Sequence, residues 1–314
     1  MSGMPGVGSG EIVVAVVGPT ATGKSDLGVA IAQRLGGEVV NADSMQLYRG
    51  MDVGTAKLTV DERRGVPHHL LDVWDVRDAA NVADYQCLAR AAFADIGSRG
   101  RTPVLVGGSG LYVRAALDRM DFPGADEEVR RRLEADLAES GPAAMHARLA
   151  AADPAAASAI LPSNGRRVVR ALEVVELTGS YTATLPEPAY AVPAVQIGLA
   201  VARPALDERI ARRVDRMWRR GLVDEVRGLA DQGLREGRTA SRALGYAQVL
   251  RHLTGEWTEG HARDETVRAT RRFARRQESW FRRDPRVVWL DAGDGLEELA
   301  ESSLRHLGGV AGSW

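Results

Sequence analysis

Eight residues near the N-terminus have the types and the spacing of a phosphate-binding loop. They are Gly18, Pro19, Thr20, Ala21, Thr22, Gly23, Lys24 and Ser25. The apolar run 12–17 before them indicates a buried strand, and a helical pattern follows over 25–35. In this setting backbone N–H groups surround an anion, Lys24 reaches the terminal phosphates and the Ser25 hydroxyl coordinates Mg²⁺. Nucleotides and other diphosphates suit such a loop equally.

A second group of candidate residues, NADSMQLY over 41–48, follows the apolar pair Val39 and Val40. Ligands of open α/β sheets bind beyond the carboxyl ends of the strands, so this loop should lie beside the phosphate loop. Asp43 could then ligate Mg²⁺ through water or act as a general base. As a helix cap or turn former it would carry no chemistry. The sequence GGSGLY over 107–112 offers backbone amides and the Ser109 hydroxyl at the same edge.

Arginines recur at helical spacing in two later segments of the chain, 209–220 and 268–283. Such a series is typical either of a solvated helix face or of a surface that holds an RNA backbone. Phe273, Trp280 and Phe281 lie among the arginines of the second segment. They favour base stacking if they are exposed, and a core face of the helix if they are buried.

Apolar runs at 39–40, 70–73, 104–106 and 197–201 predict further strands, and helical patterns cover 81–98 and 111–117. Their alternation indicates an α/β protein with a parallel sheet and helices on both faces. Residues 118–193 have helical spacing without a convincing strand, and we interpret them as a helical insertion. The core would then comprise 1–117 and 194–314, with helices over 204–283, a last strand at 287–290 and a terminal helix at 296–307.

The composition is that of an ordinary globular protein, with 45% hydrophobic residues, 26% charged residues and a net charge of −1 over 314 residues. The single Cys87 excludes an internal disulfide and a Cys-based zinc site. With no signal peptide or membrane span expected, we predict a cytoplasmic protein. Only two of the 41 basic residues are lysines, and Lys57 is expected near the same anion as Lys24. Adjacent His68 and His69 favour a loop-positioning role over a shared metal site.

Taken together, these motifs resemble the tRNA dimethylallyltransferases, also called tRNA isopentenyltransferases. The resemblance rests on eight segments in order: 18–25, 41–57, 67–72, 105–112, 167–175, 203–217, 244–246 and 270–282. It implies a P-loop NTPase-like parallel sheet and an inserted all-helical small domain that grips the tRNA anticodon arm. The implied reaction moves a dimethylallyl group from dimethylallyl diphosphate, with Mg²⁺, to the N6 amine of the adenosine immediately 3′ of the anticodon.

The resemblance also implies roles for individual residues. Asp43 matches the catalytic carboxylate, Thr20 and Ser109 match residues of the active-site channel, and Arg209 matches a diphosphate-contacting arginine. The expected tRNA contacts are Asp43, Ser44, Met45, Gln46, Arg166, Arg167 and Arg170, to which the arginine-rich segment adds Arg272, Arg275 and Arg276. The chain departs from the family at Asn164 and Arg166, where Asp and Gln are common. We therefore expect this segment to recognise the anticodon loop more through the charge of the RNA backbone than through amide hydrogen bonds. Nothing in the chain demands more than a monomer.

Three other functions compete with this one. A small-molecule kinase would share the phosphate loop but leaves the insertion and both arginine series unexplained. An isopentenyltransferase acting on free AMP would leave the RNA-binding segments without a role. A non-catalytic RNA-binding protein would not need Lys24, Ser25 and Asp43 together.

Overall fold

The core of the protein is a six-stranded, all-parallel β-sheet with the strand order β3-β2-β4-β1-β5-β6. The computed structural model describes residues 12–311. Its strands are β1 (Val13–Val17), β2 (Glu38–Asn41), β3 (His68–His69), β4 (Pro103–Gly107), β5 (Ala194–Ala200) and β6 (Val287–Asp291). The strand β1 lies between β4 and β5, and all five of its residues are buried because helices pack on both faces of the sheet.

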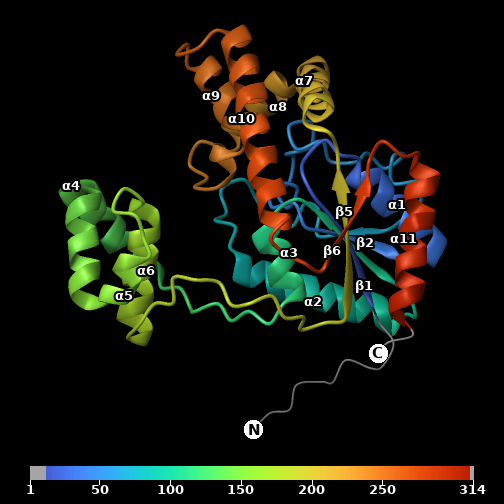
Figure 1. Ribbon diagram of the computed structural model, residues 1–314. Coiled ribbons are helices and arrows are strands. Elements are labelled where there is room, and N and C mark those ends of the chain that lie inside the picture. The colour runs from blue at the N-terminus through green and yellow to red at the C-terminus, as the bar shows by residue number, and fades with distance from the viewer. Residues whose placement is uncertain (1–11, 312–314) are drawn as a thin grey trace. The chain divides into compact units, whose positions relative to one another are not determined.

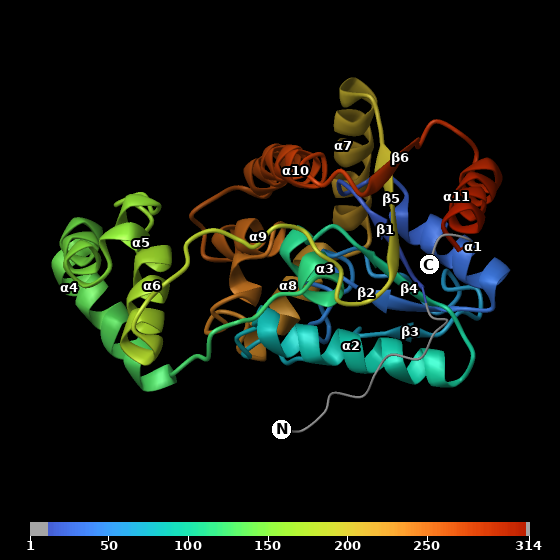
Figure 2. The same ribbon diagram turned by 60° about the horizontal axis from the view of Figure 1, so that its bottom comes forward.

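Helices cover both faces of this sheet (Figures 1 and 2). The alternation of side chains along β1 shows the two layers. Val14 and Val16 face a layer that contains α1 (Lys24–Leu35) and α11 (Leu296–Ala311). Val13, Ala15 and Val17 face a layer that contains α2 (Val82–Ser98) and α3 (Gly110–Leu117). The predicted α/β fold with a parallel sheet between helices is therefore confirmed.

A group of helices beyond β5 packs on the long loop that follows β2. These helices are α7 (Arg203–Arg219), α8 (Leu222–Asp231), the short 3-10 helix η1 (Ala240–Arg242), α9 (Tyr246–Leu253) and α10 (Glu259–Phe281). Tyr48 and Met51 of the loop share a buried cluster with Leu222 and Tyr246. Glu225 accepts hydrogen bonds from the backbone N–H groups of residues 52, 53 and 54. The loop is thereby fixed to α8.

Residues Met120–Ala189 form a second compact unit with a core of its own. It contains α4 (Glu127–Ala152), α5 (Pro154–Ser158) and α6 (Gly165–Thr178), and α4 is kinked at Gly141, which precedes Pro142. Leu133, Leu149 and Val168 lie in its apolar cluster. This unit falls within the 118–193 insertion that the sequence predicts, and it contains no strand in the described residues.

The predicted strand at 70–73 is wrong. The strand at this edge comprises only His68 and His69, and the chain then bends because Leu70 and Asp72 have left-handed backbone angles (φ 60° and 59°). The apolar pattern of 70–73 reflects packing instead, since Leu70 and Val73 contact the core beside the sheet. None of the helices within residues 12–311 is long and apolar enough to cross a membrane.

Candidate active site

The phosphate-binding loop connects β1 to α1 with the geometry that its glycines predict. Gly18 and Gly23 have φ angles of 127° and 97°, which residues other than glycine rarely adopt. At Gly18 the backbone of β5 also leaves little space, because a Cβ atom would lie 3.0 Å from the Leu199 carbonyl oxygen. The Thr22 hydroxyl donates to the Pro19 carbonyl at 2.9 Å and closes the turn. The loop therefore curls directly in front of the N-terminus of α1, where its backbone N–H groups are placed to bind an anion.

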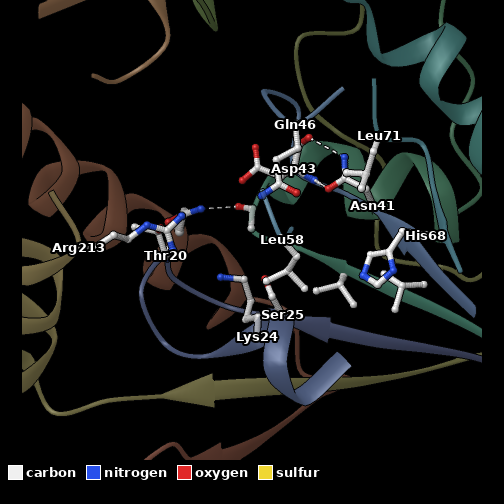
Figure 3. Close-up of a pocket in the computed structure, with 15 residues that line it drawn as sticks. Thr20, Lys24, Ser25, Asn41, Asp43, Gln46, Leu58, His68, Leu71 and Arg213 are labelled. Atoms are coloured by element: carbon white, nitrogen blue, oxygen red, sulfur yellow. Dashed lines mark hydrogen bonds between the residues drawn. The ribbon is translucent and has the colours of Figure 1, made fainter. Parts of the chain in front are cut away.

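Lys24 is the first residue of α1, and its side chain faces a cavity at the carboxyl edge of the sheet (Figure 3). Its ammonium donates to the Pro19 carbonyl at 2.6 Å. Burial and the nearby positive charge of Arg213 lower the pKa of Lys24 to about 7, and the charge of Asp43 opposes them. A lysine held in this state gains its full charge when an anion enters the cavity.

Asp43 follows β2 in a loop that the side chain of Asn41 shapes. The Asn41 amide accepts from the Asp43 backbone N–H at 2.9 Å and donates to the carbonyls of Asp43 and Leu70, both at 3.0 Å. The Asp43 carboxylate accepts from the Met45 backbone N–H through Oδ1 at 3.0 Å. These bonds fix the orientation of a carboxylate that lines the cavity.

The loop after β4 lies at the same cavity as the loops after β1 and β2. Ser109 Oγ accepts from the Ser44 backbone N–H at 3.1 Å and lies 3.2 Å from the Ser44 hydroxyl. Gly107 and Gly108 line the cavity, whereas Ser109 is not among its lining residues in the described part of the chain. The observed contact of Ser109 is thus with the loop that carries Asp43.

Arg213 lines the cavity, whereas Arg209, to which the family resemblance gives the diphosphate contact, is not among its lining residues in the described part of the chain. Arg213 donates to the Thr55 carbonyl at 3.1 Å, and burial lowers its pKa. Arg209 lies one turn earlier on α7 and donates to the Ala292 carbonyl at 3.2 Å. Both belong to the same helical arginine series, and spacing alone does not show which of the two faces the sheet edge.

Sequence reasoning missed Gln277 altogether. This residue of α10 is only 6% exposed and reaches two loops at once. Its Oε1 accepts from the Thr20 backbone N–H at 2.9 Å, and its Nε2 donates to the Gly108 carbonyl at 2.8 Å. The recurring arginines of this helix mark its exposed face in the sequence. A single glutamine on the buried face forms no pattern that could be recognised.

The two histidines form strand β3 and have separate partners. His68 lines the cavity, its Nδ1 lies 2.8 Å from the Val66 carbonyl oxygen, and burial lowers its pKa. His69 lies with its Nε2 2.6 Å from the Glu38 carboxylate. Polar and apolar side chains complete the lining of the cavity. The polar ones are Thr20, Ser25, Asn41 and Gln46, and the apolar ones are Val39, Leu58, Leu71 and Val106.

Lys57 does not lie at this site, contrary to expectation. Its ammonium binds Asp52 and Asp72 at 2.5 and 2.6 Å and donates to the Tyr48 carbonyl at 3.1 Å. Its side chain is 3% exposed. The second lysine therefore stabilises the loop after β2 and does not line the cavity.

Comparison with known proteins decides the family. The family model described as IPP transferase matches residues 46–284. A tRNA dimethylallyltransferase of Thermobifida fusca is 71% identical over 302 residues, which cover 94% of this chain and 95% of that protein. The solved structure of a tRNA isopentenylpyrophosphate transferase from Bacillus halodurans is 44% identical with a TM-score of 0.71, covering 95% and 96% of the two chains. The chain belongs to the IPP transferase family.

A second similar structure is that of a eukaryotic dimethylallyltransferase acting on tRNA. It is 26% identical, with a TM-score of 0.75 over 90% of this chain and 74% of the other. The family prediction and the prediction of a transferase are confirmed.

The arginines that the sequence predicts as tRNA contacts lie in two segments of the chain. Arg272, Arg275 and Arg276 are exposed on α10. On the opposite side of the helix Phe281 is buried and Trp280 packs on the core, so the core-face interpretation of these two aromatic residues is correct. The ring centroid of Phe273 lies 5.8 Å from the guanidinium carbon of Arg276.

In the 120–189 unit the three candidate arginines differ in their contacts. Arg166 and Arg167 are exposed at the start of α6, where the Asn164 side chain caps the helix by accepting from the Arg167 N–H at 3.3 Å. Arg170 instead binds the Glu173 carboxylate at 2.9 Å and the Pro123 carbonyl at 2.7 Å. Glu173 is fully buried, so the observed contacts of Arg170 support the unit itself.

Proposed function

We propose that this chain transfers a dimethylallyl group from dimethylallyl diphosphate to the N6 amine of the adenosine immediately 3′ of the anticodon in tRNA. One observation carries the proposal: a single cavity brings the phosphate-binding loop, with Lys24, together with the carboxylate of Asp43 and the guanidinium of Arg213. The cavity thus has cationic groups for a leaving diphosphate and a base for the attacking amine.

The diphosphate would occupy the end of the cavity beside α1. Backbone amides of the loop, the helix N-terminus, Lys24 and Arg213 all favour negative charge there. They become more effective as the carbon–oxygen bond to the diphosphate breaks, because the charge on the leaving group then grows. In this proposal Arg213 has the diphosphate-contacting role that the family resemblance gave to Arg209.

The oxygen donors at the site suit Mg²⁺, which we propose as the cofactor. The Ser25 hydroxyl and Asp43 line the cavity, and within residues 12–311 there is no group of three or more His, Cys, Asp or Glu side chains that could cage a metal ion. Mg²⁺ typically binds through few protein oxygens together with phosphates and water. Bound to Ser25, it would neutralise charge on the diphosphate.

At the other end, Asp43 would act as the general base. The adenine amine is a poor nucleophile because its lone pair is delocalised into the ring, and a carboxylate that accepts its proton accelerates attack by about 10²–10⁴-fold. The new bond joins N6 to the allylic carbon, the carbon–oxygen bond to diphosphate breaks, and the amine proton passes to Asp43. The channel residue Thr20 lines the same cavity, and Ser109 would act through its bond to Ser44.

The tRNA would be held by residues of both units. The adenine has to leave the base stack to reach the cavity, at a cost of a few kcal/mol. We propose that Arg166 and Arg167 contact the anticodon arm, that Arg272, Arg275 and Arg276 bind the RNA backbone, and that the loop of Ser44, Met45 and Gln46 lies against the flipped base. We propose a monomer, because nothing in the sequence demands more, and a cytoplasmic location, where its tRNA substrate is found.

A transfer assay tests the proposal. Labelled dimethylallyl diphosphate and Mg²⁺ are offered with an anticodon stem-loop, free AMP and ATP in parallel. We expect label on N6 of the stem-loop adenosine 3′ of the anticodon, and none on AMP. Label on AMP alone would make the chain a nucleotide prenyltransferase, and turnover of ATP without transfer would make it a kinase.

A further inference from the structure

We propose that Gln277 is a positioning residue that sets where the diphosphate lies along the phosphate-binding loop. The inference rests on the proposed function, since it concerns the same cavity. Gln277 comes from α10, the helix whose exposed face carries the arginine series, yet its side chain ends between the loops that follow β1 and β4.

The two hydrogen bonds of Gln277 require a side chain that both accepts and donates. One backbone group that it meets is a donor, Thr20 N–H, and the other is an acceptor, the Gly108 carbonyl. An amide offers one acceptor and one donor, whereas a carboxylate accepts only and an ammonium donates only. Both backbone groups belong to loops that line the cavity, so one side chain fixes the distance between these loops.

The segment of α10 around Gln277 packs closely on the loop that follows β4. A Cβ atom at Gly108 would overlap the Gln277 amide, and a Cβ atom at Gly110 would overlap the indole of Trp280, three residues further along α10. Ala274, one turn earlier on α10, lies in the same buried cluster as Ala21 of the phosphate-binding loop. The helix therefore approaches both loops at the closest distance that glycine and alanine allow.

A consequence for the ligand follows from the Thr20 bond. Phosphate-binding loops hold anions through successive backbone N–H groups. Here the Thr20 N–H is already bonded to Gln277, which leaves the amides that follow it, next to Lys24 and Ser25, to receive the diphosphate. The same bond holds the Thr20 side chain at the cavity wall. Without Gln277, the Thr20 amide would compete for the anion and the diphosphate could shift toward the start of the loop.

Replacement with glutamate separates this role from simple space filling. A protonated glutamic acid at position 277 accepts from Thr20 and donates to Gly108 as the amide does. The ionised form presents lone pairs to the Gly108 carbonyl and negative charge to the diphosphate, and burial shifts this ionisation toward neutral pH. Gln277→Leu fills the space but makes neither hydrogen bond.

Other charged groups near the cavity also influence its pH dependence. They are Lys24 on α1, Asp43 after β2, His68 on β3 and Arg213 on α7, together with Arg276 and Glu278 next to Gln277 on α10. All of them are present in the wild type as well. The informative quantity is therefore the ratio of the variant and wild-type dissociation constants at each pH.

The experiment is calorimetric titration of the full chain with inorganic diphosphate and Mg²⁺ between about pH 5.5 and pH 8.5. For Gln277→Glu we expect a ratio near one at the acid end that rises at least about tenfold toward the alkaline end. Gln277→Leu should show a loss of affinity that does not vary with pH. Gln33→Glu is the matched control, because Gln33 donates to the Arg64 carbonyl from the exposed side of α1.

Two results would overturn the inference while leaving the proposed function intact. One is a Gln277→Glu ratio that stays constant with pH, and the other is wild-type affinity in Gln277→Leu. Cooperative thermal melting of each variant shows that it is folded, and a misfolded variant would not regain affinity in acid. A wild-type chain that transfers no prenyl group and binds no diphosphate would overturn the inference and the proposed function together.

Discussion

The only two lysines of the chain lie in regions of opposite character. Lys57 sits between Asp52 and Asp72, so its positive charge is fully compensated within that loop. Lys24 is bonded to a neutral carbonyl and shares its cavity with the cation of Arg213, and its pKa falls to about 7. The first arrangement stabilises a loop. The arrangement at Lys24 places two cationic groups at one cavity. Their mutual repulsion and burial cost free energy in the empty protein, and a bound diphosphate would offset that cost.

The largest effect should come from the carboxylate at this cavity. Asp43→Asn keeps an acceptor for the Met45 N–H but cannot take a proton from the adenine amine. We expect the single-turnover rate of prenyl transfer to fall by about 10²–10⁴-fold, while affinity for an anticodon stem-loop changes little. Rapid-quench kinetics with the stem-loop measures this, with Asp61→Asn, an exposed site, as the control. Near-normal turnover would remove Asp43 from the role of base.

The two arginines of α7 give the next comparison. Arg213→Ala removes a charge-assisted contact in the cavity, and we expect inorganic diphosphate with Mg²⁺ to bind about 10–100-fold more weakly. Arg209→Ala removes a bond to the Ala292 carbonyl and should leave that affinity nearly unchanged. Calorimetric titration of both variants decides between them. If Arg209→Ala had the larger effect, the sequence-based assignment would be right.

Loss of Lys57 should affect stability and not ligand binding. Lys57→Met leaves Asp52 and Asp72 without their common partner, but both carboxylates are about half exposed. We therefore expect the free energy of unfolding to fall by only about 1–3 kcal/mol. Urea denaturation measures the loss, and diphosphate titration of the folded variant provides the contrast. A large loss of diphosphate affinity with unchanged stability would place Lys57 at the functional site.

The smallest effect concerns the outer face of α10. Replacing Arg275 and Arg276 with alanine should weaken stem-loop binding and reduce the slope of log affinity against log salt by about one to two. Binding measured across a salt series tests this. Arg305→Ala on α11 is the control, since its contact with Glu301 at 4.0 Å is exposed. An unchanged salt slope in the double variant would show that this face is merely solvated.

Local motifs were predictable from the sequence because a few neighbouring residues determine them. The phosphate-binding loop needs only Gly18, Gly23, Lys24 and Ser25 between a strand and a helix, and the apolar runs of β1 and β4 require a buried sheet. The short edge strand was predicted in the wrong place, because the apolar residues of 70–73 pack on the core from a bend.

Residues that act across long sequence separations were harder to find. Gln277 meets Thr20 over 257 positions, and no pattern near either residue announces the contact. The choice between Arg209 and Arg213 depends on the rotation of α7 relative to the sheet edge, which tertiary packing sets. Lys57 was misplaced for the same reason, since the bend at 70–72 brings Asp72 to it from another part of the loop.

The most direct test of the contrast between the two lysines is proton uptake on diphosphate binding. With a pKa of about 7, Lys24 is mostly neutral in the free protein near pH 8, and an anion beside it raises that pKa. Binding near pH 8 should therefore take up close to one proton, and affinity should fall as the pH rises above 7. Calorimetry in buffers of different ionisation enthalpy counts the protons, with Lys24→Met as the reference for protons taken up by the diphosphate itself. Uptake that exceeds that of Lys24→Met by nearly one proton would support the account, and equal uptake in the two proteins would contradict it.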